Sequence, residues 1–388
     1  MSSERIVIVG AGPAGLSTAR SYRNCEGTAE VTLVGAETFA PYERPPLTKE
    51  LLRGELAASE LSIEAEEWFE ANDVKLLLGS RVSAIDPRRG TVTLDDHIRL
   101  PAETIVLATG SEPLRPPIPG MEHPNIHTIR ALPDSEGVIE ATAAAERVLV
   151  IGTGFIGCEI AASLAMRGLE VSLIGEEELP QQSRLGSQAA AQIARWLQEL
   201  GVRLIGGTSV SSVEGGQAVE LENGERIEGS LIVLGTGVRP RGELAQTAGL
   251  EMHEGAVVVD ETMRASGSQE NVLAVGDIAY AFNTAAGRHL RVEHWGDALG
   301  QGEVAGQTLA GARTSWKSVP GFWSTIGTQT IKYAAWGDGF DESRLIADDD
   351  GFTVWYERDG AAVGVLTHEH DQDYESGREL IGQKAPTP

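Results

Sequence analysis

The chain has 388 residues, 46 of them glycine, and a formal net charge of −26 at pH 7. This length allows two or three domains with a large buried core. The acidity argues against binding to nucleic acid or to an anionic membrane surface. No apolar stretch approaches a membrane span, and the first predicted strand begins near Arg5, which leaves no room for a signal peptide. We therefore expect a cytoplasmic protein.

The first predicted unit covers residues 5–37 and contains a strand, a glycine-rich turn, a helix and a second strand. An apolar run ends at Val9 and is followed by Gly10-Ala11-Gly12-Pro13-Ala14-Gly15. Glycines at this spacing permit a tight turn, close approach of the backbone to a pyrophosphate, and close packing of helix on strand. Glu37 follows the second strand, where a carboxylate would accept hydrogen bonds from an adenosine ribose; the alternative is a surface loop carboxylate.

A second unit, from Val148 to Glu177, repeats this pattern with the turn Gly152-Thr153-Gly154-Phe155-Ile156-Gly157. Each unit is followed by an apolar strand that ends in a small turn, Ala108-Thr109-Gly110 in the first and Gly235-Thr236-Gly237 in the second. The chain is therefore predicted to be an internal duplication of a nucleotide-binding unit. Two bound dinucleotides indicate electron transfer between them.

The residues after the second strand of the repeat bear on the choice of nicotinamide cofactor. The strand ends in Ile174-Gly175-Glu176-Glu177-Glu178. A carboxylate here accepts a hydrogen bond from a ribose 2′-hydroxyl and repels a 2′-phosphate. Glu176 and Glu177 are both candidates, and Arg184 is the only nearby cation, so NADH is favoured over NADPH.

The chain has two cysteines, Cys25 and Cys158, and they form no C-x-x-C pair. A redox dithiol is therefore not expected, and both thiols are predicted to be structural. A flavin must then hold the electrons. No metal site is predicted.

The remaining sequence predicts a strand at 271–275 ending in Gly276-Asp277, a glycine-rich helix from Trp295 to Leu309, and an antiparallel sheet in the last 70 or so residues. The predicted fold is α/β, with two Rossmann-like dinucleotide-binding domains and a C-terminal α+β domain. We expect a discontinuous dinucleotide-binding domain (1–112 and 236–312), a second dinucleotide-binding domain (113–235) and the C-terminal domain (313–388).

The order of these motifs resembles the flavoprotein reductases of the glutathione-reductase type. Within them it is most similar to NADH-dependent ferredoxin reductases that serve oxygenases and cytochromes P450; rubredoxin reductases and apoptosis-inducing factor are more distant. The most specific segments are Pro41-Tyr42-Glu43-Arg44-Pro45-Pro46-Leu47-Thr48-Lys49 and Glu293-His294-Trp295-Gly296-Asp297-Ala298-Leu299-Gly300-Gln301-Gly302. The resemblance implies that FAD is held by the first glycine loop and the turns at 108–110 and 276–277, and NADH by the second glycine loop.

The resemblance also implies a reacting centre at Lys49 and Glu159, which meet beside flavin N5 in such proteins. Lys49 would stabilise the negative charge that builds on the flavin as hydride arrives. Glu159 is placed in the first helical turn after Gly157, and the alternative is a plain helix N-terminal carboxylate. Trp295 would border the flavin, or would instead be a core tryptophan. Asp277 would accept hydrogen bonds from the flavin ribityl chain, or would instead cap a helix.

The glycine-rich helix is expected to aim its N-terminus at the flavin and to pack closely on a cofactor or a neighbouring helix. Arg44, stiffened by two prolines, is predicted to lie near the flavin or its pyrophosphate. In full, the predicted cofactor-binding residues are Gly10, Gly12, Pro13, Ala14, Gly15, Glu37, Arg44, Pro45, Lys49, Val82, Ala108, Thr109, Gly110, Arg130, Gly152, Gly154, Phe155, Ile156, Gly157, Glu159, Glu176, Glu177, Gly237, Gly276, Asp277, Glu293, His294, Trp295, Ala298 and Trp323.

The implied function is an FAD-dependent reductase, monomeric or homodimeric, that takes hydride from NADH and passes single electrons to an iron–sulfur ferredoxin. Alternatives are a rubredoxin reductase, an NADH oxidase or quinone reductase, and a redox-sensing interaction protein similar to apoptosis-inducing factor. Docking of an acidic ferredoxin would need a cationic patch. One departure from the family pattern is Thr325-Ile326, which replaces an acid and an amide expected near the flavin or the docking face. The candidate patch residues are Arg288, Arg291, Arg313 and Lys317.

Overall fold

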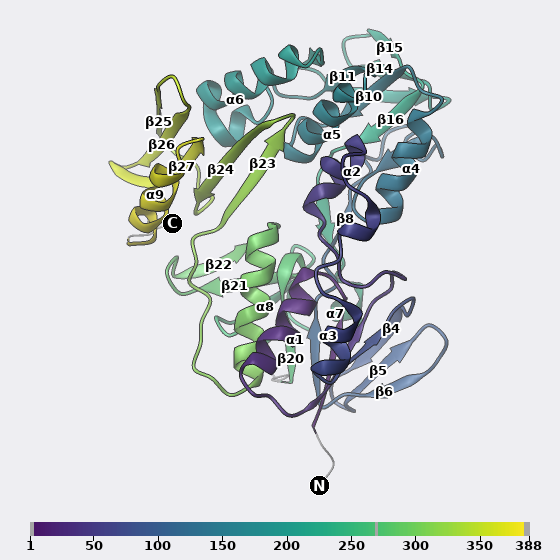
Figure 1. Cartoon of the computed structure of the whole chain (residues 1–388), viewed down its shortest axis with the longest axis vertical. Helices are drawn as coiled ribbons and strands as arrows, with labels where there is room; N and C mark the ends of the chain where they lie inside the picture. Colours follow the sequence, from purple (N-terminus) through teal and green to yellow (C-terminus); the bar gives the residue numbers. More distant parts are fainter. Residues whose placement is uncertain (1–3, 268–270, 384–388) are drawn as a thin grey trace.

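The protein is described by a computed structural model that covers residues 4–267 and 271–383. Figure 1 shows one parallel sheet in the lower half, with helices α1 and α8 beside it, and a second parallel sheet in the upper half, close to α5 and α6. The C-terminal strands lie at the side of the upper half. In the described ranges, no helix combines the length and apolar character needed to cross a membrane.

The first parallel sheet has the strand order β20-β7-β1-β2-β3. Its central strand β1 is followed by the first glycine turn and by α1 (Pro13–Asn24), which begins at Pro13 because proline suits the first position of a helix. The edge strand β20 comes from far downstream in the chain and pairs parallel with β7. The strands are β1 (Arg5–Val9), β2 (Glu30–Val34), β3 (Val74–Leu77), β7 (Thr104–Leu107) and β20 (Val272–Ala274).

The second parallel sheet has the order β12-β11-β10-β16-β9. Here β10 is the central strand, followed by the second glycine turn and α5 (Phe155–Met166). All five strands come from one continuous stretch, because β9 precedes β10 in the chain. They are β9 (Ile126–Thr128), β10 (Arg147–Ile151), β11 (Glu170–Ile174), β12 (Arg203–Ile205) and β16 (Leu231–Leu234).

The duplication extends beyond the parallel strands. Each unit also contains a three-stranded antiparallel sheet between its third parallel strand and the strand before its small turn. In the first unit this sheet is β4 (Val82–Asp86), β5 (Thr91–Leu94) and β6 (Arg99–Pro101). In the second unit it is β13 (Val210–Glu214), β14 (Ala218–Leu221) and β15 (Arg226–Glu228).

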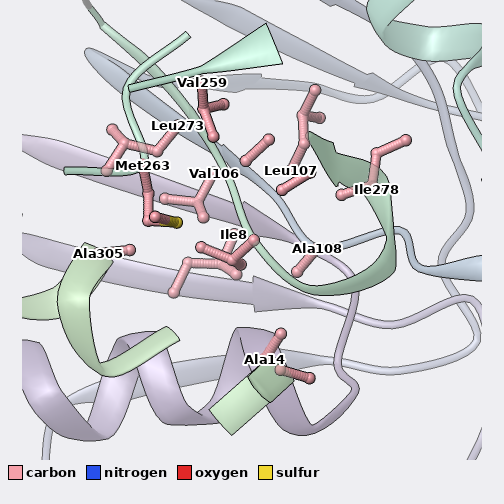
Figure 2. Close-up of a cluster of buried hydrophobic side chains, with 14 of the residues drawn as sticks. Ile8, Ala14, Val106, Leu107, Ala108, Val259, Met263, Leu273, Ile278 and Ala305 are labelled. Atoms are coloured by element: carbon pink, nitrogen blue, oxygen red, sulfur yellow. The ribbon is translucent and has the colours of Figure 1, made fainter. Parts of the chain in front are cut away.

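The core of the lower half forms where α1 and α8 (Trp295–Leu309) cover the first parallel sheet. Figure 2 shows Ile8 of β1, Val106 of β7 and Leu273 of β20 close to Ala305 of α8. Each of these four side chains is at most 2 % exposed. Burial of an aliphatic side chain contributes about 1.5–3 kcal/mol, so this layer holds the sheet and both helices together.

The C-terminal region forms an antiparallel sheet of order β23-β24-β27-β26-β25, and helix α9 packs on it. The acidic segment 348–351 joins β25 to β26. Residues ahead of the sheet pack elsewhere, since Trp316 is buried in the core of the lower half. The elements are β23 (Gly321–Ile326), β24 (Gln329–Ala335), β25 (Glu342–Ala347), β26 (Phe352–Arg358), β27 (Ala361–His368) and α9 (Asp371–Gln383).

The predicted fold class is confirmed by the two parallel sheets and the separate antiparallel sheet. A further sheet, β18-β19-β21-β22, lies beside α8, and β8 pairs with β17 where the chain passes between the halves. The remaining elements are η1 (Pro45–Thr48), α2 (Glu50–Arg53), η2 (Ala58–Glu60), α3 (Glu66–Ala71), β8 (Ser111–Pro113), α4 (Leu132–Thr142), α6 (Gln182–Glu199), β17 (Val238–Pro240), α7 (Glu243–Thr247), β18 (Met252–His253), β19 (Ala256–Val259), η3 (Gly276–Ile278), β21 (Ala279–Asn283) and β22 (Arg288–Arg291).

Candidate active site

One large cleft, of about 1460 Å³, runs along the carboxyl ends of both parallel sheets. Pockets for a single drug-sized ligand measure about 300–1,000 Å³, so this cleft has room for more than one such molecule. Parallel sheets of this kind bind ligands outside the carboxyl ends of their strands. Both glycine turns contribute to the wall, and Phe322 and Trp323 of β23 and the glycines at 337 and 339 close it from the C-terminal region.

The backbone of both glycine turns fits a dinucleotide loop. Gly10 has φ +119° and Gly152 has φ +106°, and a Cβ atom at either position would lie within 2.4 Å of a carbonyl oxygen of the neighbouring strand-end turn. A Cβ atom at Gly15 would lie 2.1 Å from the Gly10 oxygen, and one at Gly157 would lie 1.9 Å from the Gly152 oxygen. These glycines therefore permit the tight turn and the close helix packing that the sequence predicted.

Most of the predicted cofactor-binding residues line this one cleft. Four do not: Gly15, Gly152 and Gly157 are packed behind the loops, and Glu176 points to solvent. The predicted residues on the wall are Gly10, Gly12, Pro13, Ala14, Glu37, Arg44, Pro45, Lys49, Val82, Ala108, Thr109, Gly110, Arg130, Gly154, Phe155, Ile156, Glu159, Glu177, Gly237, Gly276, Asp277, Glu293, His294, Trp295, Ala298 and Trp323.

Glu37 and Arg44 meet on the wall beside the first glycine turn. Arg44 donates to Glu37 Oε1 at 2.7 Å, and the Tyr42 hydroxyl donates to Oε2 at 2.6 Å. A second guanidinium nitrogen of Arg44 donates to the carbonyl of Arg130 at 2.6 Å. Burial raises the pKa of Tyr42, so its hydroxyl stays protonated and available as a donor. Neither charged residue is a free loop charge.

Asp277 lies at the end of β20, in η3, and is joined to two neighbours. Arg130 and the Ser111 hydroxyl both donate to its Oδ2, each at 2.5 Å. No side-chain cap is formed at this short helix, so the capping alternative is wrong. The ion pair places a guanidinium and a carboxylate together on the wall between the Ala-Thr-Gly turn and the Gly-Asp turn.

Lys49 and Glu159 make contact, although they lie 110 residues apart in the sequence. The Lys49 ammonium is 3.1 Å from Glu159 Oε2, and both residues are buried, at 5 % and 3 % exposed. The placement of Glu159 in the first helical turn is wrong, because α5 begins at Phe155 and has no acidic residue in its first turn. Buried and paired, Glu159 is also not a plain helix N-terminal carboxylate.

Two hydroxyl side chains that the sequence analysis did not predict also donate hydrogen bonds to Glu159. The Thr48 hydroxyl donates to Glu159 Oε2 at 2.5 Å, and the Ser324 hydroxyl donates to Oε1 at 2.7 Å. Thr48 adjoins Lys49, so the resemblance in the 41–49 segment carried a weak signal for it. Ser324 lies in the C-terminal sheet, and no local pattern indicates its contact with α5.

The N-terminus of α8 faces the cleft through Trp295 and Ala298. Trp295 is half-buried on the wall and lies outside the hydrophobic core clusters, so the core alternative is wrong. His294 lies 3.4 Å from the buried Asp297 and contacts the ring of Phe322. Burial, followed by the charge of Asp277, raises the pKa of Glu293 above its ordinary value of 4.5 despite the opposing effect of Arg291.

The structure separates the two candidate carboxylates of the second unit. Glu177 lines the cleft and accepts a hydrogen bond from the backbone of Ser183 at 3.2 Å, whereas Glu176 is exposed outside it. Arg184 is also on the wall, with its guanidinium carbon 5.9 Å from the centre of the Phe155 ring. The cleft therefore presents one carboxylate and one guanidinium near the second glycine turn.

The sequence also missed two arginines on the wall, Arg81 and Arg241. Arg241 is anchored beside the Ala-Thr-Gly turn, since its N–H donates to Gly110 and its carbonyl accepts from Thr109. Burial, followed by repulsion from Arg130, lowers the pKa of Arg241. Neither arginine belongs to a recognisable motif. They line the same wall as Arg44 and Arg130, which are paired with Glu37 and Asp277.

The predicted cationic docking patch is wrong for two of its four members. Arg288 forms an ion pair with Asp338 at 2.5 Å, and Arg291 lies 3.7 Å from Glu254 and 3.4 Å from Glu293. Arg313 and Lys317 are exposed. Asp338 and Glu254 are remote in sequence from the arginines they pair with, so the pattern of basic residues alone did not reveal these pairs.

The positions of the departure at Thr325-Ile326 do not line the cleft. The Thr325 hydroxyl bonds to that of Thr330 across the sheet, and Ile326 is fully buried in the core beneath α5. The substitution is therefore accommodated by packing within the C-terminal sheet. Cys25 and Cys158 are both free, and burial raises the pKa of the Cys158 thiol, which keeps it protonated.

Comparisons with known proteins agree with this architecture. Residues 4–302 match the family model described as pyridine nucleotide-disulphide oxidoreductase. The chain is 34% identical to the ferredoxin–NAD(+) reductase component of the anthranilate 1,2-dioxygenase system of Burkholderia cepacia, over 84% of this chain and 80% of the relative. It is 33% identical to rubredoxin–NAD(+) reductase of Pseudomonas putida, over 84% and 85% of the two chains.

Among solved structures, the covalent putidaredoxin reductase–putidaredoxin complex matches with a TM-score of 0.92 and 28% identity, over 99% of this chain and 94% of the matched chain. The two glycine turns, the shared cleft and the family match over residues 4–302 agree with one another. The chain belongs to the pyridine nucleotide-disulphide oxidoreductase family, whose members use FAD and a nicotinamide nucleotide.

Proposed function

We propose that this chain is an FAD-dependent reductase that takes hydride from NADH and passes single electrons to a ferredoxin serving an oxygenase or a cytochrome P450. The observation that carries the proposal is the buried Lys49–Glu159 pair on the wall of the cleft, between the two glycine turns. The chain's resemblance to the ferredoxin–NAD(+) reductase component of a dioxygenase system supports the choice of acceptor.

The roles proposed for the site residues follow from their chemistry. FAD, when bound, supplies an acceptor that takes two electrons together and releases them singly. Lys49 would place a positive charge beside the flavin, on which negative charge would develop as hydride arrives. Glu159 keeps that ammonium in position. The arginines at the other end of the cleft, Arg44, Arg130 and Arg241, would hold a pyrophosphate.

Glu177 is the residue we propose for selecting NADH over NADPH. A carboxylate on the wall would accept a hydrogen bond from a ribose 2′-hydroxyl and repel a 2′-phosphate. Glu177→Ala should raise the KM for NADH and reduce the preference for NADH over NADPH. Glu176→Ala is the matched control, because this neighbour is exposed and outside the cleft. If the two changes have equal effects, or if neither has an effect, Glu177 is not the residue that selects NADH.

The domain division is also proposed. Strands β8 and β17 pair antiparallel where the chain enters and leaves the upper half. This crossing supports boundaries at 112/113 and 235/236, with 1–112 and 236–312 binding FAD, 113–235 binding NADH, and 313–388 forming the C-terminal domain.

A screen of electron acceptors tests the function. The holoenzyme is given NADH, and reduction of several purified ferredoxins and rubredoxins is followed, with dioxygen and a quinone as comparison acceptors. Turnover with a ferredoxin well above that with the other acceptors is expected. Preference for a rubredoxin would favour the second candidate, which the resemblance to rubredoxin–NAD(+) reductase supports. Rapid turnover with dioxygen or quinone alone would contradict both.

A further inference from the structure

The carboxylate of Glu159 is held by three donors that come from different parts of the chain. Lys49 and Thr48 donate to Oε2, and Ser324 donates to Oε1. All four residues are at most 5 % exposed. A carboxylate has about four lone-pair positions, so three donors leave roughly one acceptor position free on Oε1.

Thr48 is itself fixed against α5 by a second hydrogen bond. The Ser163 hydroxyl, one helical turn beyond Glu159, donates to the Thr48 carbonyl at 2.7 Å. The end of η1 is therefore bound to α5 through one bond in each direction. This double contact fixes the point from which Lys49 extends.

Ser324 provides the link to the C-terminal sheet. It lies in β23 between Trp323, which is 43 % exposed on the cleft wall, and Thr325, which does not line the cleft. Its hydroxyl reaches Glu159 Oε1 at 2.7 Å. A buried serine hydroxyl would otherwise require a partner within its own sheet. In β23, the buried Ser324 hydroxyl instead donates to Glu159 of α5, outside the C-terminal sheet.

We propose that Ser324 and Thr48 are positioning residues that orient the Glu159 carboxylate, and through it the Lys49 ammonium, toward the coenzyme that accepts or delivers hydride. Ser324 does not line the cleft, and Thr48 lies on its wall with its hydroxyl donated to Glu159, so the proposed effect of both runs through Glu159. They act by fixing both carboxylate oxygens, so that Glu159 cannot turn away and leave Lys49 unpaired in a buried site. The inference rests on the proposed function only for the identity of the hydride donor, NADH.

The test measures the first half-reaction alone, by anaerobic stopped-flow reduction of the bound flavin with NADH. Ser324→Ala should lower the limiting rate about tenfold to a hundredfold, since small displacements of positioned groups cost rates of this size. Ser324→Thr, which keeps the hydroxyl, should recover most of the loss. Thr325→Val is the matched control on the same strand, since its hydroxyl bonds only to that of Thr330 in the sheet.

A double-mutant cycle separates positioning from simple stability. If Ser324 acts through Glu159, Ser324→Ala should change the limiting rate little once Glu159→Gln is present. The same rate loss in both backgrounds would overturn the proposal. So would an unchanged rate in Ser324→Ala accompanied only by a lower Tm.

Should Ser324→Ala fail to fold, Thr48→Val and Thr48→Ser test the same idea from η1. A slow Thr48→Val with a recovered Thr48→Ser supports it, and two unaffected variants oppose it. Because no iron–sulfur protein enters this assay, a failure of ferredoxin reduction would remove the proposed function and leave this result standing. A wild-type flavin that NADH does not reduce would instead count against the hydride site as a whole.

Discussion

Arg241 is held beside the Ala-Thr-Gly turn because its backbone N–H donates to Gly110 and its carbonyl accepts from the Thr109 hydroxyl, and the residue lines the cleft. The nearest carboxylate, on Glu112, is 3.9 Å away and is shared with Arg239 at 2.6 Å. Repulsion from Arg130 and Arg44 opposes its charge. A dianionic pyrophosphate would relieve this repulsion, which makes Arg241 the clearest test of where the phosphates bind.

We expect Arg241→Gln to raise the Kd for FAD about tenfold, equivalent to about 1.4 kcal/mol, because one charge-assisted hydrogen bond is lost at a partly exposed site. Titration of apoprotein with FAD, followed by flavin fluorescence, measures this. Arg239→Gln is the control, since Arg239 is more exposed and outside the cleft. Riboflavin, which has no phosphate, should bind both variants equally. Weaker riboflavin binding to Arg241→Gln would mean a general disturbance.

Glu293 supplies a pH-dependent test. Its folded pKa is raised, chiefly by burial, so the native state binds the proton more tightly than the unfolded chain does. The stabilising contribution is complete below the ordinary pKa of 4.5 and is lost as pH rises through the folded pKa. Glu293→Gln should therefore gain Tm relative to wild type as pH increases above 4.5.

Thermal melts of both proteins from acid to neutral pH provide the measurement. Glu254→Gln is the control, because Glu254 also neighbours Arg291 but is 72 % exposed. The gain in Tm with rising pH should be larger for Glu293→Gln than for this control. A Tm difference that does not change with pH for Glu293→Gln would show that burial does not perturb this carboxyl.

At the scale of single elements, the glycines of helix α8 differ in how closely they pack against α1. A Cβ atom at Gly302 would lie 2.4 Å from the Ala14 oxygen, and one at Gly306 would lie 2.6 Å from atoms of α1. Gly300 has no atom within 4 Å of such a Cβ, and Gly296 has one at 4.0 Å. Close packing of α8 on α1 thus requires only part of the glycine series.

We expect Gly302→Ala to destabilise the protein by about 1–3 kcal/mol, because α1 and α8 would have to move apart. Gly300→Ala, two residues earlier on the same helix, should stabilise it by about 0.5–1 kcal/mol through the lower entropy of the unfolded chain. Urea unfolding of both variants measures whether each change lowers or raises the free energy of unfolding. If both changes destabilise equally, helix crowding at Gly302 is not the cause.

Local sequence patterns predicted the elements well. The two β-branched runs, the glycine turns and the helix at 295–309 depend on neighbours in the chain, and the structure has each of them. Contacts between elements were predicted only where the family resemblance supplied them, as for Lys49 with Glu159. The bonds from Ser324 and Arg241, and the pairing of Arg288 with Asp338, depend on tertiary packing that no local pattern encodes.

Across the whole molecule, the cleft joins distant segments of the chain. Its wall runs from Val9 near the N-terminus to Gly339 in the C-terminal region. Removing FAD should therefore lower the stability of the entire fold. With free FAD at a hundredfold excess over its Kd, the holoprotein should be about 2.7 kcal/mol more stable than the apoprotein.

Calorimetric melts at several FAD concentrations measure this stabilisation. The transition temperature should rise with the logarithm of FAD concentration, and transitions from the lower and upper halves should shift together. If only one of two transitions responded to FAD, the cleft would not couple the two halves.

The strand order of the two sheets has a consequence for biosynthesis. The second sheet is complete once residue 234 has emerged from the ribosome, because its strands all lie between Ile126 and Leu234. The first sheet lacks its edge strand β20 until residue 274 has been made. The later unit can therefore mature first, while the open edge of β7 needs protection from pairing with other nascent chains.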